Sequence, residues 1–211
     1  AEEPRSRTQL LMPMVESVLI EAGIKPNQLH AIGVAIGPGS FTGLRIGFAA
    51  TQGLAFGLDI PVIPVSSLKV MVATYIRKTV NVQLPVKHSQ MLRVMAILDA
   101  RMGEFNCGCY TIDHNGVIAS EFSDRLLTAA DAKQWVEKLS PEVIVGDGEA
   151  LLASGSVWTG TLKPIFPDAI DLLGITLLSY HKGDAVPISA VDLVYLRGAD
   201  AWQKRKRIRD A

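Results

Sequence analysis

The residues that most resemble a ligand site are the closely spaced glycines between positions 37 and 43, which read GPGSFTG. They follow a short apolar run and precede a predicted helix, and free backbone N–H groups at a helix start attract phosphate. The candidates for such an anion site are Gly37, Gly39, Ser40, Thr42 and Gly43. The loop lacks the Gly-Lys-Ser/Thr of a P-loop and misses the G-x-G-x-x-G spacing by one residue. A tight strand-to-helix connection with a Ser40 or Thr42 cap is therefore the favoured interpretation.

Other reactive side chains show no spacing typical of a catalytic or metal site. The four histidines form no H-x-x-x-H or H-E-x-x-H pair, so we predict no metal site. Ser40 does not lie in a G-x-S-x-G elbow, and we predict no catalytic residue. Asp99, Arg101 and Glu104 cluster at a predicted strand end. They could form a catalytic carboxylate site, but an ion pair that braces the turn is favoured.

Two predicted helices carry more apolar and small residues than one core face needs. Between Thr8 and Ala22 the apolar residues cover an arc of about 200° at 100° per residue. In the helix that ends at Leu58, the only strongly polar side chains are Arg45 and Gln52, and small residues lie opposite them. This helix could be a core helix buried nearly all round, or both helices could face another subunit. The predicted interface residues are Leu11, Met14, Val15, Val18, Gly43, Arg45, Gly47, Ala50, Leu54 and Gly57.

Short apolar strands alternate with helices along the chain, which predicts an α/β fold. Strands are expected at 31–36, 62–65, 93–98, 105–112 and 143–145, and helices at 8–22, 42–58, 66–77, 128–139 and 168–180. The periodicity lapses between 79 and 90, where Pro85 interrupts the chain. We therefore predict a first lobe at 1–80, a connector at 81–90, a smaller second lobe at 91–203 and a basic tail at 204–211.

The composition predicts a folded protein with apolar surface to bury. The 211 residues are 48% hydrophobic and 20% charged, and the mean hydropathy is +0.25. Basic and acidic residues number 21 each, but the first 203 residues contain 16 and 20, a net charge of −4. The remaining basic run could attract an RNA backbone, although such runs are more often simply solvated. It consists of Lys204, Arg205, Lys206, Arg207 and Arg209.

The two cysteines and the apolar segments bear on the compartment. Cys107 and Cys109 match neither a redox C-x-x-C motif nor a four-ligand zinc pattern, so we expect a reducing, cytoplasmic environment. No secretory signal is visible at the start of the sequence. No apolar stretch reaches the roughly 18 uninterrupted residues of a spanning helix, so we expect no membrane association.

The sequence GPGSFTGLRIG at 37–47, with QGLA at 52–55, closely resembles the bacterial TsaB (YeaZ) family. Further matching segments are LMPMV at 11–15, DARMGE at 99–104 and VYLR at 194–197, so the resemblance covers most of the chain. It implies the fold of actin, sugar kinases and Hsp70 (ASKHA), with two α/β lobes. Family members begin with a strand that carries a phosphate motif and with a hairpin, and this sequence starts after them.

The resemblance also implies a function in tRNA modification, the addition of threonylcarbamoyl to the adenosine next to the anticodon of tRNAs that read codons beginning with A. The implied partners are a TsaD-like catalytic subunit, a TsaE-like ATPase and tRNA reached through the complex, with a homodimer when the protein is alone. No intrinsic cofactor is implied, and ATP or ADP would bind at the interface of the complex. The leading hypothesis is a non-catalytic scaffold; the alternative is an ATP-binding kinase or hydrolase of the same fold.

Overall fold

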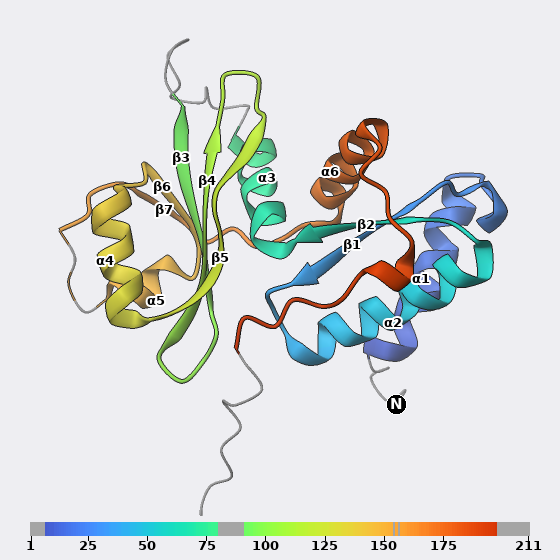
Figure 1. Ribbon diagram of the computed structural model, residues 1–211, viewed down its shortest axis with the longest axis horizontal. Coiled ribbons are helices and arrows are strands. Elements are labelled where there is room, and N and C mark those ends of the chain that lie inside the picture. The colour runs from blue at the N-terminus through green and yellow to red at the C-terminus, as the bar shows by residue number, and fades with distance from the viewer. Residues whose placement is uncertain (1–6, 80–90, 154, 156, 198–211) are drawn as a thin grey trace, which may run out of the picture.

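The computed structural model describes residues 7–79, 91–153, 155 and 157–197, which form two sheets flanked by helices (Figure 1). A parallel pair joins β1 (Ile32–Gly37) to β2 (Val62–Ser66). A second sheet has five strands in the order β5-β4-β3-β6-β7. The predicted connector at 81–90 and the basic tail at 204–211 lie outside the described residues.

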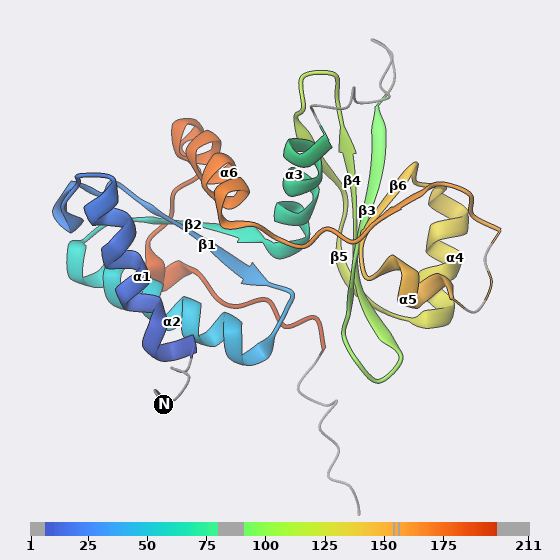
Figure 2. The same cartoon turned by 180° about the vertical axis from the view of Figure 1, so that it is seen from behind.

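The first sheet is built as the sequence predicts, by short apolar strands that alternate with helices. These are α1 (Arg7–Glu21), α2 (Phe41–Leu58) and α3 (Ser67–Thr79), and the turn η1 (Pro26–Gln28) lies between α1 and β1. The side chain of Ser40 caps α2 and Asp59, in the left-handed conformation, ends it. Both views show α1 and α2 on one side of β1 and β2, with α6 (Ala169–Lys182) on the other (Figure 2).

The C-terminal part of the described chain belongs to the first sheet, so the predicted second lobe at 91–203 is wrong from α6 onward. Val62 and Val186 exchange two backbone hydrogen bonds of 2.8 and 2.9 Å, and the N–H of Val194 donates to the carbonyl of Ile36 at 2.8 Å. Val191, after the turn η2 (Ile188–Ala190), is buried beside Val34 of β1. Apolar parallel strands are buried on both faces of their sheet, and α6 packs on the face opposite α2.

The second sheet combines antiparallel and parallel pairs. Strands β3 (Leu92–Asp99), β4 (Glu104–Ile112) and β5 (Ile118–Thr128) are antiparallel, whereas β6 (Val143–Gly146) and β7 (Thr161–Lys163) run parallel to β3. Helices α4 (Ala129–Leu139) and α5 (Gly148–Leu152) pack on one face, where Val136 and Leu151 meet Ile97. The pairing of β3 with β4 agrees with the predicted strands at 93–98 and 105–112.

Helix α3 packs between the two sheets and holds them together. Its residues Leu68, Met71, Val72 and Tyr75 form one core with the second sheet, and Arg77 reaches α6 on the other side. There the guanidinium donates to Asp171 and to Asp168, each at 2.8 Å. Because Asp171 is almost fully buried and Arg77 approaches it with two nitrogens, this ion pair fixes α6 to α3.

Candidate functional site

Helix α2 is covered on one face only. Phe48, Thr51 and Ala55 are buried against the first sheet, whereas Ala49, Gly53 and Gly57 are exposed and Phe56 is 85% exposed. The interpretation of α2 as a core helix buried nearly all round is therefore wrong. The sequence could not distinguish the two cases, because the open face of this helix is as apolar as its buried face.

Three of the four glycines of α2 face open space within the described part of the chain. A Cβ atom built at Gly47, Gly53 or Gly57 meets no heavy atom within 4 Å. The close approach that these small residues permit is therefore not used inside the described structure. Of the predicted small-residue face, Gly43 and Gly57 are exposed and Gly47 and Ala50 are half-buried. Ala49 and Gly53 are also exposed, and the sequence prediction left them out.

Helix α1 adds exposed apolar side chains next to α2, which it contacts. Leu11, Val15 and Leu19 recur every four residues and are half-buried, so this face is turned toward the rest of the molecule. Met14 and Val18 are 62% and 63% exposed. Among the interface residues predicted in α1, Met14 and Val18 are thus accessible to a partner, whereas Leu11 and Val15 are partly used within the chain. Leu54 of α2 is likewise half-buried.

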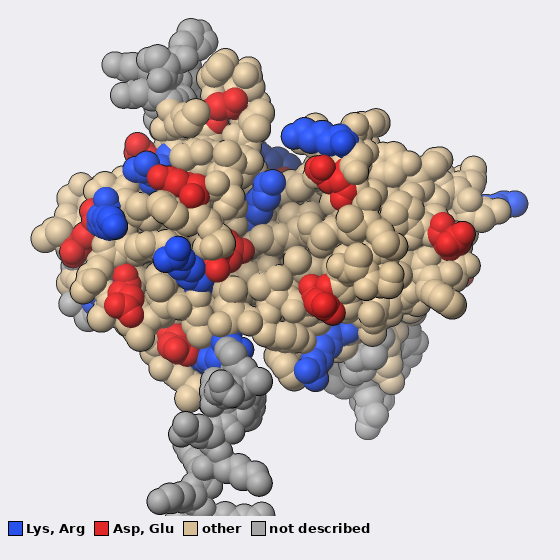
Figure 3. All heavy atoms as spheres, in the orientation of Figure 1, with Lys and Arg blue, Asp and Glu red and all other residues tan. Residues whose placement is uncertain are grey.

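We give the name α1–α2 surface to six of the exposed apolar and small residues of the two helices. It consists of Met14, Val18, Ala49, Gly53, Phe56 and Gly57. Arg45 is the only charged residue in the 18 residues of α2. Figure 3 shows the consequence: charged side chains gather over the second sheet, and few interrupt the surface over α2. Exposed uncharged patches of this kind mark protein interaction sites.

At the start of α2 lies an aromatic–arginine cluster formed by Phe41, Arg45 and Tyr195. The guanidinium carbon of Arg45 lies 3.7 Å from the centre of the Phe41 ring, and its Nε donates to the Tyr195 hydroxyl at 3.1 Å. The two ring centres are 5.6 Å apart. Phe41 is 52% and Tyr195 45% exposed. Sequence reasoning placed Arg45 in the helix interface and missed both rings, since Tyr195 lies 150 residues away in the chain.

Asp99, Arg101 and Glu104 brace the β3–β4 turn, as the favoured interpretation predicts, but with an additional partner. Asp99 accepts from the backbone N–H of Arg101 at 2.7 Å and pairs with its guanidinium at 3.3 Å. Glu104 instead pairs with Arg197, which also donates to the carbonyls of Ala100 and Arg101 at 3.1 and 3.2 Å. The extended segment after η2 is thereby fixed to the second sheet. These contacts support the interpretation of the three residues as a brace of the turn.

The glycine-rich loop has structural reasons for its composition. Gly37 has a φ of +114°, and a Cβ there would lie 2.8 Å from the carbonyl oxygen of Val194. The Ser40 hydroxyl accepts from the N–H of Gly43 at 3.4 Å. Gly39, Ser40, Thr42 and Gly43 are exposed. Their use as a phosphate site stays a prediction.

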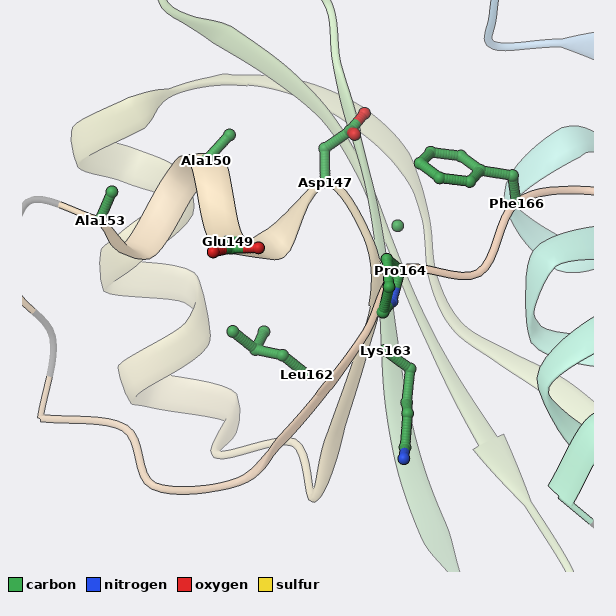
Figure 4. Close-up of a pocket in the computed structure, with 9 residues that line it drawn as sticks. Asp147, Glu149, Ala150, Ala153, Leu162, Lys163, Pro164 and Phe166 are labelled. Atoms are coloured by element: carbon green, nitrogen blue, oxygen red, sulfur yellow. The ribbon is translucent and has the colours of Figure 1, made fainter.

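A hollow of about 400 Å³ lies at the ends of the parallel strands β6 and β7 (Figure 4). Asp147 and Glu149 supply its carboxylates, and Leu162 and Phe166 its apolar wall. Figure 4 shows Lys163 extending away from both carboxylates. An excess of negative charge makes this hollow a poor site for a nucleotide triphosphate.

Three further observations concern metals, thiols and membranes. No group of three or more His, Cys, Asp or Glu in the described ranges is arranged to hold a metal ion. Both cysteines are unpaired and buried, and burial raises the pKa of each thiol to about 12. None of the described helices has the length and apolarity needed to span a membrane.

Comparisons with known proteins point to tRNA modification. Residues 3–126 match the family model of TsaD, described as tRNA N6-adenosine threonylcarbamoyltransferase. The Escherichia coli K12 protein named tRNA threonylcarbamoyladenosine biosynthesis protein TsaB is 34% identical over 206 residues, which cover 95% of this chain and 85% of that protein. The chain belongs to the TsaB family.

The fold of this TsaB-family chain is also found in solved structures. The structure described as YeaZ from Pseudomonas aeruginosa matches with a TM-score of 0.75 and 31% identity, covering 92% of this chain and 87% of that one. A tRNA N6-adenosine threonylcarbamoyltransferase from Magnetococcus marinus is 43% identical over 65 residues, 31% of this chain and 18% of the enzyme. The resemblance to TsaB and the ASKHA-type α/β fold that it implied are thus confirmed.

Proposed function

We propose that this TsaB-family protein is the non-catalytic partner of a TsaD-type subunit that adds threonylcarbamoyl to a tRNA adenosine, and that the two pair through the α1–α2 surface. The observation that carries the proposal is the open face of α2, where Gly53 and Gly57 leave room for the backbone of another helix. Short residues let two helix axes approach closely, so dispersion contacts form along both backbones.

The similarity to TsaD supports a pair built from related halves. The matched residues 3–126 include both α1 and α2, so a TsaD-type subunit is expected to present helices of similar design. Two copies of one surface can associate about a twofold axis, which gives a homodimer when the protein is alone. A related subunit can replace the second copy. Homodimer and heterodimer would therefore compete for the same residues.

The other functional assignments extend this proposal. We propose that a TsaE-type ATPase docks on the assembled pair, and that ATP or ADP binds at the interface of the complex. Asp147 and Glu149 would repel the phosphates of a nucleotide in the hollow of the second sheet, which agrees with a nucleotide site elsewhere in the complex. Contact of Lys204, Arg205, Lys206, Arg207 and Arg209 with tRNA is also proposed; these cations lie outside the described residues. Two unpaired buried thiols are consistent with a cytoplasmic protein.

A matched pair of glycine substitutions tests the interface. Gly53→Arg places a long cation on the α1–α2 surface, and Gly174→Arg places the same side chain on the exposed side of α6. Both positions are open to a Cβ, so both variants should fold. Light scattering after size-exclusion chromatography with the TsaD-type subunit should show a complex for Gly174→Arg and separate subunits for Gly53→Arg. A complex that survives Gly53→Arg would remove the α1–α2 surface from the proposal.

A further inference from the structure

The aromatic–arginine cluster is organised before any partner arrives. One face of the Arg45 guanidinium lies on Phe41, and its Nε is held by the Tyr195 hydroxyl at 3.1 Å. A guanidinium stacked on a ring keeps its two terminal amino groups free to donate to an acceptor outside the cluster. Both rings are nonetheless about half exposed. The arrangement therefore offers a fixed cation next to two accessible aromatic surfaces.

The charge of Arg45 is not neutralised within the described part of the molecule. The ion pairs there involve Arg77, Arg93, Arg101 and Arg197, and none includes Arg45. Its contacts to Phe41 and Tyr195 orient the guanidinium but supply no negative charge. A ligand that uses both parts of the site would bring an anion for the exposed guanidinium and a flat apolar group for the rings.

We propose that the aromatic–arginine cluster binds an unpaired nucleotide of the tRNA, with the base stacked on the exposed ring surface and a phosphate on Arg45. The inference rests on the proposed function, because it names the contact that this chain makes with the RNA substrate of the complex. Unpaired bases commonly stack on aromatic side chains and on arginine planes. A nucleotide carries a flat base and an anionic phosphate close together, as the adjacent rings and guanidinium of the cluster require.

The surroundings of the cluster favour RNA over a protein partner. Tyr195 precedes Arg197 by two residues, and Arg197 fixes the turn on which the exposed Arg101 lies, although Asp99 partly offsets that charge. Five further cations at 204–209 follow in the sequence and lie outside the described residues. The α1–α2 surface beside the cluster is uncharged, whereas the cluster itself combines the Arg45 guanidinium with two exposed rings. That combination suits a nucleotide better than an apolar helix face.

The test measures RNA binding by the assembled complex. The chain is purified with its TsaD-type subunit, and fluorescence anisotropy reports binding of an unmodified, labelled transcript of a tRNA that reads a codon beginning with A. Phe41→Ala and Tyr195→Ala should each weaken binding about 10-fold, the loss expected for one base stack. Tyr195→Phe keeps the ring and should change affinity less than about 3-fold. Phe166→Ala is the matched control, because it truncates a ring of similar exposure that lies in the wall of the hollow beside the second sheet.

Arg45→Gln tests the phosphate contact separately. Removing one phosphate contact lowers the slope of log K against log salt by about 0.7 to 0.9, whereas the loss of a ring leaves that slope unchanged. Unchanged affinity in Phe41→Ala and Tyr195→Ala overturns the inference. So does loss of the TsaD-type subunit from either variant, because the cluster would then be a protein contact. Failure of the proposed function gives a different result, since the wild-type chain would form no complex.

Discussion

Truncation of Phe56 separates the role of α2 in association from its role in folding. Phe56 is 85% exposed, whereas Phe48, about 80° away around the same helix at 100° per residue, is 8% exposed. Complete burial of a phenylalanine side chain contributes roughly 1.5–3 kcal/mol. If the exposed part of Phe56 is covered by the partner, Phe56→Ala should weaken the complex by about 1.3–2.5 kcal/mol, which is roughly 10- to 70-fold in Kd.

The two phenylalanines should respond in opposite ways in two assays. Phe56→Ala should change the free energy of unfolding by less than about 0.5 kcal/mol, because the ring makes few contacts within the chain and alanine is a better helix former. Phe48→Ala removes a buried ring beside Val34 and should destabilise the protein by about 3–5 kcal/mol. Urea denaturation measures the first quantity, and calorimetric titration with the TsaD-type subunit measures Kd.

The reasoning fails if Phe56→Ala leaves Kd within 2-fold of the wild-type value. It also fails if the variant lowers the urea midpoint as strongly as Phe48→Ala, since Phe56 would then be packed within the chain. Because both substitutions remove the same ring from the same helix, the comparison controls for helix propensity and for the chemistry of the side chain.

Three further predictions concern stability. The half-buried ion pair of Arg197 with Glu104 joins the C-terminal segment to the β3–β4 turn. A double-mutant cycle with Arg197→Gln and Glu104→Gln, measured by urea denaturation, should therefore give a coupling energy of about 1–2 kcal/mol. Additive effects of the two substitutions would show that the two side chains do not interact. Cys107 and Cys109 should resist alkylation at pH 8.5 until the protein unfolds. Since the pKa of each buried thiol is about 12 when folded against a usual 9.0, the free energy of unfolding should fall as pH rises from 9 toward 12; rapid native labelling would show that the thiols are accessible. Asp168 accepts a hydrogen bond from the N–H of Ile170 and faces Arg77, and both contacts lower the pKa of its carboxyl group. Its contribution to the free energy of unfolding is therefore present above pH 3.8 and is lost as the pH falls further. Asp168→Asn should make the urea midpoint less sensitive to pH between about pH 5 and pH 2.5, and an unchanged pH dependence would refute this assignment.

Local chemistry in the sequence predicts the elements of the first sheet well. Val62, Ile63 and Val65 are apolar and β-branched, and Pro61 and the Ser66 cap bound the segment, so a strand followed by a helix is the natural outcome. The apolar run before Gly37 predicts β1 in the same way. Strand β7 could not be predicted, because its three residues are all exposed and no alternation is visible over so short a segment.

The arrangement of distant segments could not be predicted from the same signals. The pattern of α6 indicates an amphipathic helix but carries no information on which sheet it covers. The ion pair of Asp171 with Arg77 and the bridge of Val186 with Val62 decide that point, and both join residues more than 90 positions apart. The aromatic–arginine cluster depends on the same return of the chain, since it brings Tyr195 to the start of α2. Candidate sites made within one segment were therefore visible in the sequence, and those made between segments were not.

The glycines of α2 indicate which helix a close partner would use. Each interior glycine destabilises a helix by about 1 kcal/mol relative to alanine, so Gly47, Gly53 and Gly57 together cost roughly 2–3 kcal/mol. No contact in the described chain offsets this, because a Cβ at each position would meet open space. Helix α6 has one open glycine, Gly174, with the exposed Leu173 and Leu177 beside it, whereas α2 has three open glycines, with the exposed Phe56 beside Gly53 and Gly57. A partner that packs against backbone would therefore recover more of the loss at α2 than at α6, which is why the α1–α2 surface is assigned to the subunit contact.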